Sequence, residues 1–361
     1  MDPAPSRGMT VYRMKHMNEP MDEPAALAVA ALAREADPEL RGRNPAVWLD
    51  RLEAERARLG AVLAWCVENK RFVMGLDIAA GVWPYWLNRG HLPEGAAWLS
   101  QLLDAPGADA PALGRARALA GAGNLCFHQG DFAGSEARLR ESLRLFESLQ
   151  NAQGIAEARG GLSRVAMSRG DSAGMREHSR LALEAARQSD YETGIAIALH
   201  HLAHASLIEG DLVAAERLYA GNVAAYRGMQ RRDLVASELH NLGHVACLRG
   251  DTQHAKALFI ESLLLADQIG ASAIRPYDLI GLGRVAVAQG HPATGARLLG
   301  AGMAILNREG KAVVPLLRPE VERVIAETQA ALSSDGYAAA AAAGAGLSTQ
   351  SALALMEGLS P

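Results

Sequence analysis

The sequence predicts an all-α protein, a right-handed superhelical solenoid of antiparallel helix pairs with helical caps at both ends. Two observations lead to this prediction. A glycine followed by Asp or His recurs every forty residues along much of the 361-residue chain. Hydrophobic residues make up 49% of the sequence but aromatic residues only 5%, so the apolar share leans on Ala and Leu. Such a composition favours helices and offers little to fill a β-sandwich.

The forty-residue period is the main signal. The repeated dipeptides are Gly90-His91, Gly130-Asp131, Gly170-Asp171, Gly210-Asp211, Gly250-Asp251 and Gly290-His291. Each glycine suits the position just after a helix, where a left-handed backbone is favourable for glycine, and each Asp can cap the next helix. A repeat of this length indicates a helix pair, with a fairly long connection to the next pair.

Small and large side chains also recur at fixed distances from each glycine. Small residues precede it at Gly123, Ser163, Ala203, Gly243 and Gly283, and large residues follow it at Leu99, Leu139, Tyr219, Phe259 and Leu299. Large side chains can therefore nest against small ones across each pair. This order resembles the tetratricopeptide repeat, lengthened from about thirty-four residues by a longer loop between pairs. The resemblance covers roughly residues 72–312.

The repeats divide the chain into four parts. Residues 1–22 hold five methionines among Pro, Asp and Arg without an apolar period, which indicates a disordered leader. Residues 23–71 are predicted to form N-terminal capping helices, because apolar residues between Trp48 and Trp65 have helical spacing. Residues 72–312 form six repeats and residues 313–361 the C-terminal capping helices, since a solenoid needs a cover at each end.

Three further stretches carry a second resemblance. They read NPAVWLDRLEAERARLGAVLAW, NRGHLPEGAAWL and GYAAAAAAGAGLSTQSALALM. They resemble the C-terminal helical half of large bacterial ATPase-type transcriptional regulators, the LuxR-type and related actinobacterial proteins. The resemblance implies an array that follows a nucleotide-binding switch domain and senses a ligand or partner. The sequence has no GxxxxGK[ST] loop and ends where a DNA-binding domain would be appended, so only the sensing or docking role carries over.

Charge and cysteine content exclude several classes of function. The net charge of −4, without a Lys/Arg block, makes direct nucleic-acid binding unexpected. Cys66, Cys126 and Cys247 lie far apart without CxxC spacing, so neither a disulfide framework nor a zinc ribbon is predicted. The sequence has no run of eighteen apolar residues that could cross a membrane. We expect a cytoplasmic protein without a cofactor.

The tetratricopeptide resemblance implies that the first helix of each pair lines a concave groove. Positions thirteen, ten and six residues before each glycine then identify the side chains of the groove, and its middle is rich in histidine. The expected groove residues are Arg117, Asn124, Glu157, Arg164, His200, His204, Ser237, His240, His244, Cys247, Tyr277 and Arg284. Two HxxxH pairs on neighbouring helices should place four imidazoles in one patch. Mutual repulsion would keep some of them neutral near pH 7, so that binding could depend on pH.

These groove residues leave several functions open. The favoured one is a non-enzymatic regulatory module that binds a partner protein or peptide. A small anionic ligand held by Arg164, Arg284 and the imidazoles is the main alternative, and a homodimer stays open. His200, His204, His240 and His244 have a spacing that can chelate a divalent metal, but no carboxylate behind them is evident from the sequence. A catalyst in a biosynthetic pathway is less favoured, because no nucleophile with a visible base and orienting acid stands out.

Overall fold

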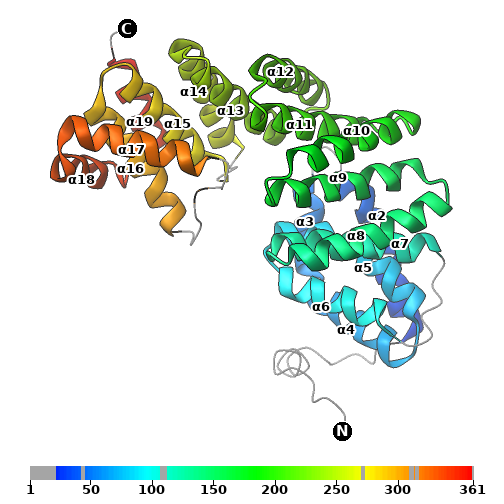
Figure 1. The fold of residues 1–361 in the computed structure, drawn as a ribbon. Coiled ribbons are helices and arrows are strands. Elements are labelled where there is room, and N and C mark those ends of the chain that lie inside the picture. The colour runs from blue at the N-terminus through cyan, green and yellow to red at the C-terminus, as the bar shows by residue number, and fades with distance from the viewer. Residues whose placement is uncertain are drawn as a thin grey trace. The chain divides into compact units, whose positions relative to one another are not determined.

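The computed structural model describes residues 22–41, 45–105, 112–269, 273–308, 313 and 317–359. It contains two compact units, the N-terminal unit (Met1–Ala198) and the C-terminal unit (Leu199–Pro361). Within the described ranges the chain forms helices and no strands, so the predicted all-α helical solenoid is confirmed (Figure 1). The leader predicted for residues 1–22 lies outside the described residues, apart from Asp22, which caps the first described helix.

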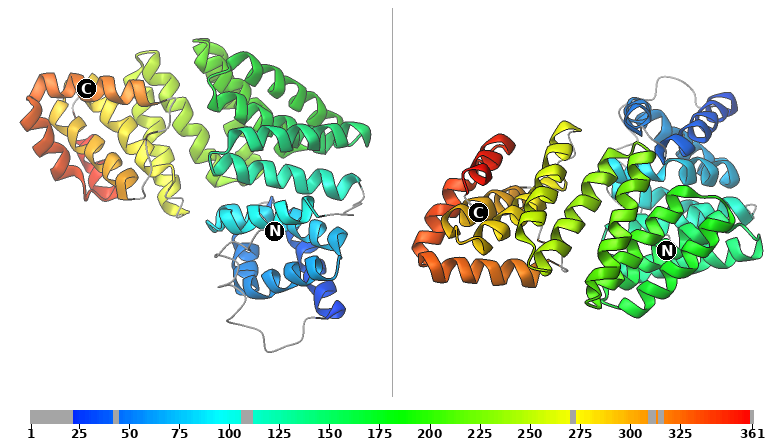
Figure 2. Two further views of the ribbon diagram at one scale, coloured as in Figure 1. Left: turned by 60° about the horizontal axis from the view of Figure 1, so that its bottom comes forward. Right: turned by 90° about the horizontal axis from the view of Figure 1, so that it is seen from above.

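The N-terminal unit consists of a helical segment followed by three antiparallel helix pairs. Its helices are α2 (Glu23–Leu40), α3 (Pro45–Ala54), α4 (Arg56–Glu68), α5 (Phe72–Asn88), α6 (Leu92–Leu103), α7 (Ala112–His128), α8 (Phe132–Ser148), α9 (Ala152–Ser168) and α10 (Ser172–Gln188). From α5 to α10 each helix packs against the next one along the chain, as the views in Figure 2 show. The division between the units falls within α11 (Glu192–Ile208).

The C-terminal unit continues the same pattern and ends in shorter helices. Its helices after α11 are α12 (Leu212–Gly228), α13 (Arg232–Leu248), α14 (Thr252–Gln268), α15 (Arg275–Ala288), α16 (Pro292–Arg308), α17 (Arg318–Leu332), α18 (Ser334–Gly344) and α19 (Thr349–Glu357). The helices α13, α14, α15 and α16 pack in sequence, and α18 lies along α16. No described helix is long and apolar enough to cross a membrane.

The structure corrects the predicted origin of the forty-residue period. The helices α8, α9 and α10 each have 17 residues. The connection between pairs, 149–151, is as short as the turn within a pair, 169–171. In these pairs the extra length relative to an ordinary tetratricopeptide repeat therefore lies in the helices and not in a longer loop. The helices α6, with 12 residues, and α15, with 14 residues, are shorter, and the connections before α7 and before α15 are longer. The connections that precede each first helix carry no glycine signal in the sequence, because their left-handed residues are Lys70, Gln150, Asp190 and Gln230.

The turns within pairs form as predicted. The six repeated glycines have φ between +71° and +82°, a region that favours glycine over other residues. The amide of the following residue bonds back to a carbonyl five residues earlier, as from Asp131 to Cys126, which closes a Schellman motif. The Asp131 side chain then caps α8 by accepting from the amide of Gly134. His91, by contrast, makes no side-chain cap.

Close packing of small against large residues holds each pair together, also as predicted. A Cβ added to Gly123 would lie 2.7 Å from Leu139. In the C-terminal unit the ring of Phe259 fills the space beside Gly243 and Gly281, at 2.7 and 2.6 Å from such a Cβ. Because Phe259 needs both glycines, the large residue of one pair also fixes the spacing to the next first helix.

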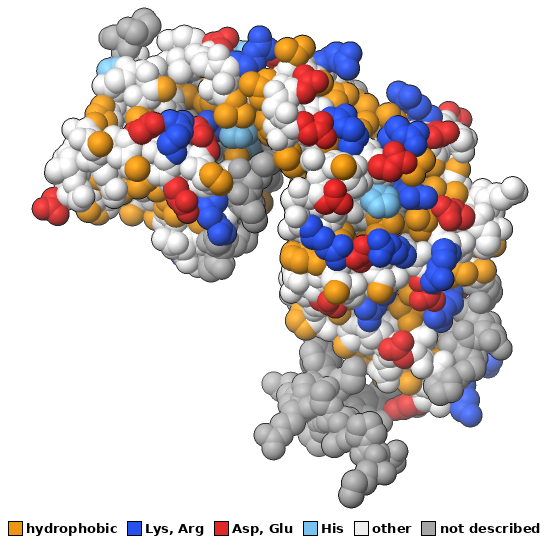
Figure 3. Space-filling view, viewed as in Figure 1, with side chains coloured by type: hydrophobic (Ala, Val, Ile, Leu, Met, Phe, Trp, Pro, Cys, Tyr) orange, Lys and Arg blue, Asp and Glu red, His pale blue; other side chains and the backbone are white. Residues whose placement is uncertain are grey.

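Charged side chains lie mainly on the outside and are mixed in sign. On the face drawn in Figure 3, acidic and basic side chains are interspersed over the helices. Pairs such as Arg169–Glu136 (2.6 Å) and Arg227–Glu261 (2.5 Å) connect neighbouring helices at the surface. Exposed ion pairs of this kind contribute little to stability. They keep the outer surface solvated.

Candidate functional site

The four predicted histidines lie together in the C-terminal unit. His200 and His204 lie one turn apart on α11, with ring centroids 4.7 Å from each other. His240 and His244 lie at the matching positions of α13, and the charges of all three other rings bear on His204. The forty-residue period therefore brings the two HxxxH pairs side by side, because matching positions of successive first helices face the same way.

Each of the four rings is anchored through its Nδ1 atom. The contacts are His200 to Glu238 Oε1 (2.8 Å), His204 to the hydroxyl of Tyr219 (2.5 Å), His240 to Asp278 Oδ1 (2.9 Å) and His244 to Nη1 of Arg284 (2.7 Å). No Nε2 atom of these rings has a hydrogen bond within the described part of the chain. We name these four residues the histidine cluster. Its unused hydrogen-bonding atoms are the four Nε2 atoms.

The anchoring partners determine which ring nitrogen carries the proton. Arg284 can only donate, so Nδ1 of His244 accepts and its Nε2 carries the hydrogen. Burial, then the charge of Glu238, raises the pKa of Tyr219 well above its usual value, so its hydroxyl stays protonated and donates to His204. His204 therefore also carries its hydrogen on Nε2. These two rings, both six residues before their glycine, offer N–H donors.

The other two rings have the opposite polarity. Glu238 and Asp278 are acceptors when ionised, so His200 and His240 donate from Nδ1 to them. The Nε2 atom of each ring is then an acceptor while the ring is neutral. On α11 and on α13, an Nε2 atom that accepts (His200, His240) is thus followed one turn later by an Nε2–H that donates (His204, His244). We assign these tautomers from the hydrogen-bond network.

The rings differ in their access to solvent. The side chain of His200 is 26% exposed, whereas that of His240 is 8% exposed. His204 is half-buried, and His244 is buried like His240. His200 and His204 are therefore the rings with more access to a ligand.

The carboxylates behind the rings were missed by the sequence reasoning. The two carboxylates occupy the position twelve residues before the repeated glycine. In the second and third repeats this position holds a buried alanine, Ala118 or Ala158, whereas in the last two repeats it holds Glu238 or Asp278. Both carboxylates are almost fully buried, and Asp278 also accepts from the hydroxyl of Ser262 at 2.7 Å. Carboxylates therefore lie behind His200 and His240, where none was evident from the sequence. The signal was present, because an acid follows each of His200 and His240 by 38 residues.

The remaining predicted residues of this unit surround the cluster. Arg284 is buried and also donates to Glu320 at 2.6 Å, so both ends of its guanidinium are occupied. Tyr277 is half-buried, with its ring centroid 6.1 Å from that of His240. Ser237 is half-buried on α13. Cys247 is a half-buried free thiol whose pKa is raised by burial.

The four predicted residues of the N-terminal unit form separate contacts. Arg117 pairs with Asp37 of α2. Asn124 is buried and accepts from Arg164, whose pKa burial lowers to about 10. Glu157 is half-buried and accepts from Gln153 at 3.2 Å. These polar groups are occupied by contacts within their own unit.

The metal alternative has a specific difficulty. Among the residues that the structure describes, no group of three or more His, Cys, Asp or Glu side chains is arranged to hold a metal ion. A metal needs an unprotonated nitrogen, but His204 and His244 carry their hydrogens on the Nε2 atoms, since Tyr219 and Arg284 donate to Nδ1. The arrangement suits hydrogen bonding better than metal ligation.

Burial makes the histidine cluster sensitive to acid. Burial, and then the charges of Arg284 and His240, lower the pKa of His244 to about 3. Burial and the other three rings lower the pKa of His204 well below its usual value. Histidine in an unfolded chain has a pKa of about 6.5. Below that pH these histidines are protonated in the unfolded chain but stay neutral in the folded chain. The free energy of unfolding therefore falls as the pH falls.

We expect the free energy of unfolding to fall between pH 7 and pH 5, and to fall less in a His244→Asn variant. With a folded pKa of about 3, His244 alone accounts for a loss of about 2 kcal/mol at pH 5. Urea denaturation followed by circular dichroism at both pH values measures the difference. The same pH dependence in the variant and the wild type would show that His244 is not held neutral.

The chain matches a group of curated proteins locally. No protein-family model matches it. A stretch of 54 residues is 37% identical to proteins described as HTH-type transcriptional regulators in Mycobacterium tuberculosis and Mycobacterium bovis. The match covers 15% of this chain and only 6% of the length of those regulators.

Solved structures show the fold over most of the chain. A Rap protein in complex with competence and sporulation factor has a TM-score of 0.59 and 13% identity, over 92% of this chain and 98% of its own. Aspartyl phosphate phosphatase F from Bacillus subtilis has a TM-score of 0.59 and 7% identity, over 93% of this chain and 97% of its own. The apo form of the quorum sensor NprR from B. thuringiensis has a TM-score of 0.50 and 16% identity, over 88% and 98%. At these identities the likeness shows the fold, and this chain is a tetratricopeptide-like helical repeat protein.

Proposed function

We propose that the histidine cluster binds an extended peptide segment of a partner protein, and that the chain is a non-enzymatic regulatory module. The observation that carries the proposal is the anchoring of all four rings through Nδ1, which leaves Nε2 atoms of alternating polarity. An extended peptide offers N–H and C=O groups to match such acceptors and donors. Rings already held by the protein lose little freedom on binding, which favours affinity.

Two similarities to other proteins support the proposed regulatory role. The Rap protein named above was solved with competence and sporulation factor, and another Rap protein, of plasmid pLS20, is a conjugation gene regulator solved with the Phr* peptide. The local match to HTH-type transcriptional regulators agrees with the LuxR-type resemblance of the sequence. We therefore place the chain in transcriptional regulation, as the part that senses a peptide or docks a partner.

The alternative of a small anion held by arginines has less support. Arg284 is committed to His244 and Glu320, and Arg164 to Asn124. An anion would have to displace these buried contacts, which is unfavourable unless every partner finds a replacement. A peptide that uses the Nε2 atoms displaces none of them.

The test is to select peptides from a random display library on the purified chain, and to titrate the enriched peptides by fluorescence anisotropy. A His200→Ala/His204→Ala variant should bind about ten to thirty times more weakly, because two hydrogen bonds of about 1 kcal/mol each are lost. An Arg227→Ala/Glu261→Ala variant, which removes an exposed pair from the outer helices, should bind as the wild type does.

A further variant shows whether weaker binding comes from the lost contact or from a change in the fold. His204→Gln keeps an amide that can bond to Tyr219 but moves the group that would face the peptide. It should retain wild-type stability and still weaken binding. If every enriched peptide binds all these variants with equal affinity, the histidine cluster is not the binding site.

A further inference from the structure

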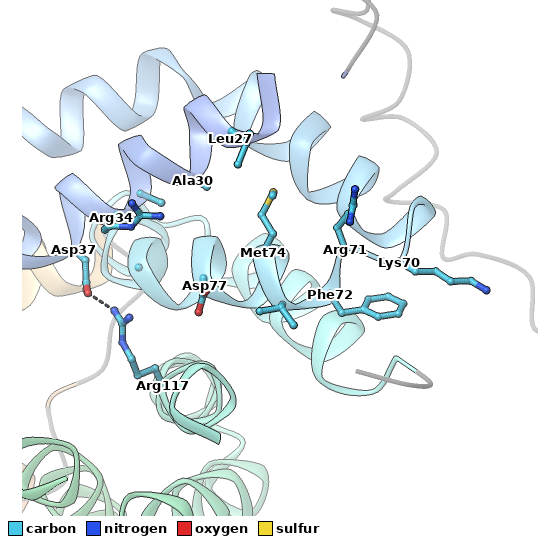
Figure 4. Close-up of a pocket in the computed structure, with 13 residues that line it drawn as sticks. Leu27, Ala30, Arg34, Asp37, Lys70, Arg71, Phe72, Met74, Asp77 and Arg117 are labelled. Carbon is cyan, nitrogen blue, oxygen red and sulfur yellow. Dashed lines mark hydrogen bonds and ion pairs between the residues drawn. The ribbon is translucent and has the colours of Figure 1, made fainter. Parts of the chain in front are cut away.

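A separate cavity of about 650 Å³ lies in the N-terminal unit. It runs between α2 and α5, with Arg117 of α7 at one end (Figure 4). Its volume lies within the range of about 300 to 1,000 Å³ that is typical of small-molecule sites. None of its lining residues belongs to the histidine cluster.

The charges at the two ends of the cavity differ. At one end, Arg34 and Arg117 are balanced by two carboxylates of the same lining, Asp37 and Asp77. Asp37 pairs with Arg117 and also with Arg41, a residue outside the lining whose charge lies close to that of Glu157. Arg34 and Arg117 lie close enough to Asp77 to lower its pKa, although burial raises it overall. This end is therefore close to neutral, and it has no unbalanced charge to hold an ion.

The other end has one positive charge in excess. Lys70 and Arg71 line it together with Phe72, and Figure 4 shows all three away from Arg117. Arg71 pairs with Glu23 at 2.7 Å, whereas Lys70 has no ion pair within the described ranges of the chain. Lys70 also has a left-handed backbone with φ of +56° and is exposed. One unpaired cation at the mouth suits one negative charge.

The middle of the cavity is apolar and open to solvent. Leu27 of α2 is 54% exposed and Val73 of α5 is 40% exposed, and Met74 lies between the two helices (Figure 4). Large apolar side chains left in contact with water inside a concave site favour an apolar ligand. Lys70 and Arg71 belong to the same lining as these apolar side chains, and Figure 4 shows Arg71 nearer to Leu27 and Met74 than Lys70, whose side chain extends away from them.

We propose that this cavity binds a monoanion with an apolar chain, that is, a medium-chain carboxylate. The carboxylate lies at Lys70 and Arg71, and the chain covers Leu27, Val73 and Met74. A dianion such as a phosphate monoester is less suitable, because only one charge at the mouth lacks a partner. The site lies in the other unit from the histidine cluster, so it is a second binding function in addition to the proposed one.

The test is isothermal titration calorimetry of the full chain with hexanoate, octanoate, octanol and octylamine at constant ionic strength. We expect saturable one-to-one binding of octanoate, tighter than that of hexanoate by about threefold to fourfold per methylene group. Octanol should bind more weakly than octanoate, and octylamine most weakly. Lack of saturable binding, or equal affinity for octanoate, octanol and octylamine, would overturn the proposal.

Variants locate the site. Lys70→Glu reverses the free charge at an exposed position, and should weaken octanoate binding at least fivefold. Arg58→Glu is the matched control, because it makes the same change on α4 at a residue that does not line the cavity. Leu27→Ala, at another exposed position, should weaken the binding of octanoate more than that of hexanoate.

If Lys70→Glu and Arg58→Glu have the same affinity for octanoate, the carboxylate does not bind where we place it. Peptide binding by the histidine cluster should be the same in all three variants, so the two proposals can fail separately.

Discussion

Asp278→Ala should lower the free energy of unfolding by about 3 kcal/mol, one of the largest effects expected of a single substitution in this chain. The carboxylate is fully buried and accepts from both His240 and Ser262. Without it, the buried Nδ1 of His240 has no partner, and an unsatisfied buried polar group is costly. Urea denaturation at pH 7 measures the loss.

The repeats themselves provide the control for this prediction. At the two matching positions the second and third repeats have Ala120 and Ala158, both buried. A His240→Ala/Asp278→Ala variant reproduces that pair, so it should be more stable than the sum of the two single losses implies. Strictly additive losses would mean that His240 and Asp278 do not depend on each other.

Gly344→Ala should also destabilise the chain by about 3 kcal/mol, the upper end of what overpacking usually costs. A Cβ at this position would lie 1.9 Å from the backbone carbonyl oxygen of Arg297 on α16. Neither backbone can move aside alone, because the helices also approach closely at Gly300 of α16, where an added Cβ would lie 2.2 Å from the backbone oxygen of Ala341 on α18. The helix α18 would have to separate from α16.

The matched control is Gly346→Ala, two residues further along. A Cβ there would meet nothing within 4 Å, and the residue is exposed. This variant should unfold at the same urea concentration as the wild type. If the two variants unfolded alike, α18 would not be packed on α16 as closely as we describe.

The fold could be predicted from the sequence because its signals are local. Each glycine with a following Asp fixes a turn by its own backbone preference and capping, and the period then places the helices. The pairing of Gly123 with Leu139 follows from their spacing. The connection between successive pairs could not be predicted. Its left-handed residues include Gln150 and Gln230, and glutamine has no marked preference for that backbone conformation.

The candidate site was only half predictable. The HxxxH spacing placed His200, His204, His240 and His244 on one face, because matching positions of stacked repeats coincide. Their partners come from other helices, as Tyr219 of α12 does, and depend on which way each ring turns in the packed structure. The cavity beside α2 was missed for the same reason. Only tertiary packing brings Leu27 next to Met74.

The most direct test of the central claim is a long-range ¹H–¹⁵N NMR spectrum of the histidine rings, recorded before and after addition of a selected peptide. Before addition, His204 and His244 should show hydrogens on Nε2, and His200 and His240 hydrogens on Nδ1. The peptide should then shift the Nε2 signals of His200 and His204 most. Peptide binding that leaves all four rings unchanged would contradict the account.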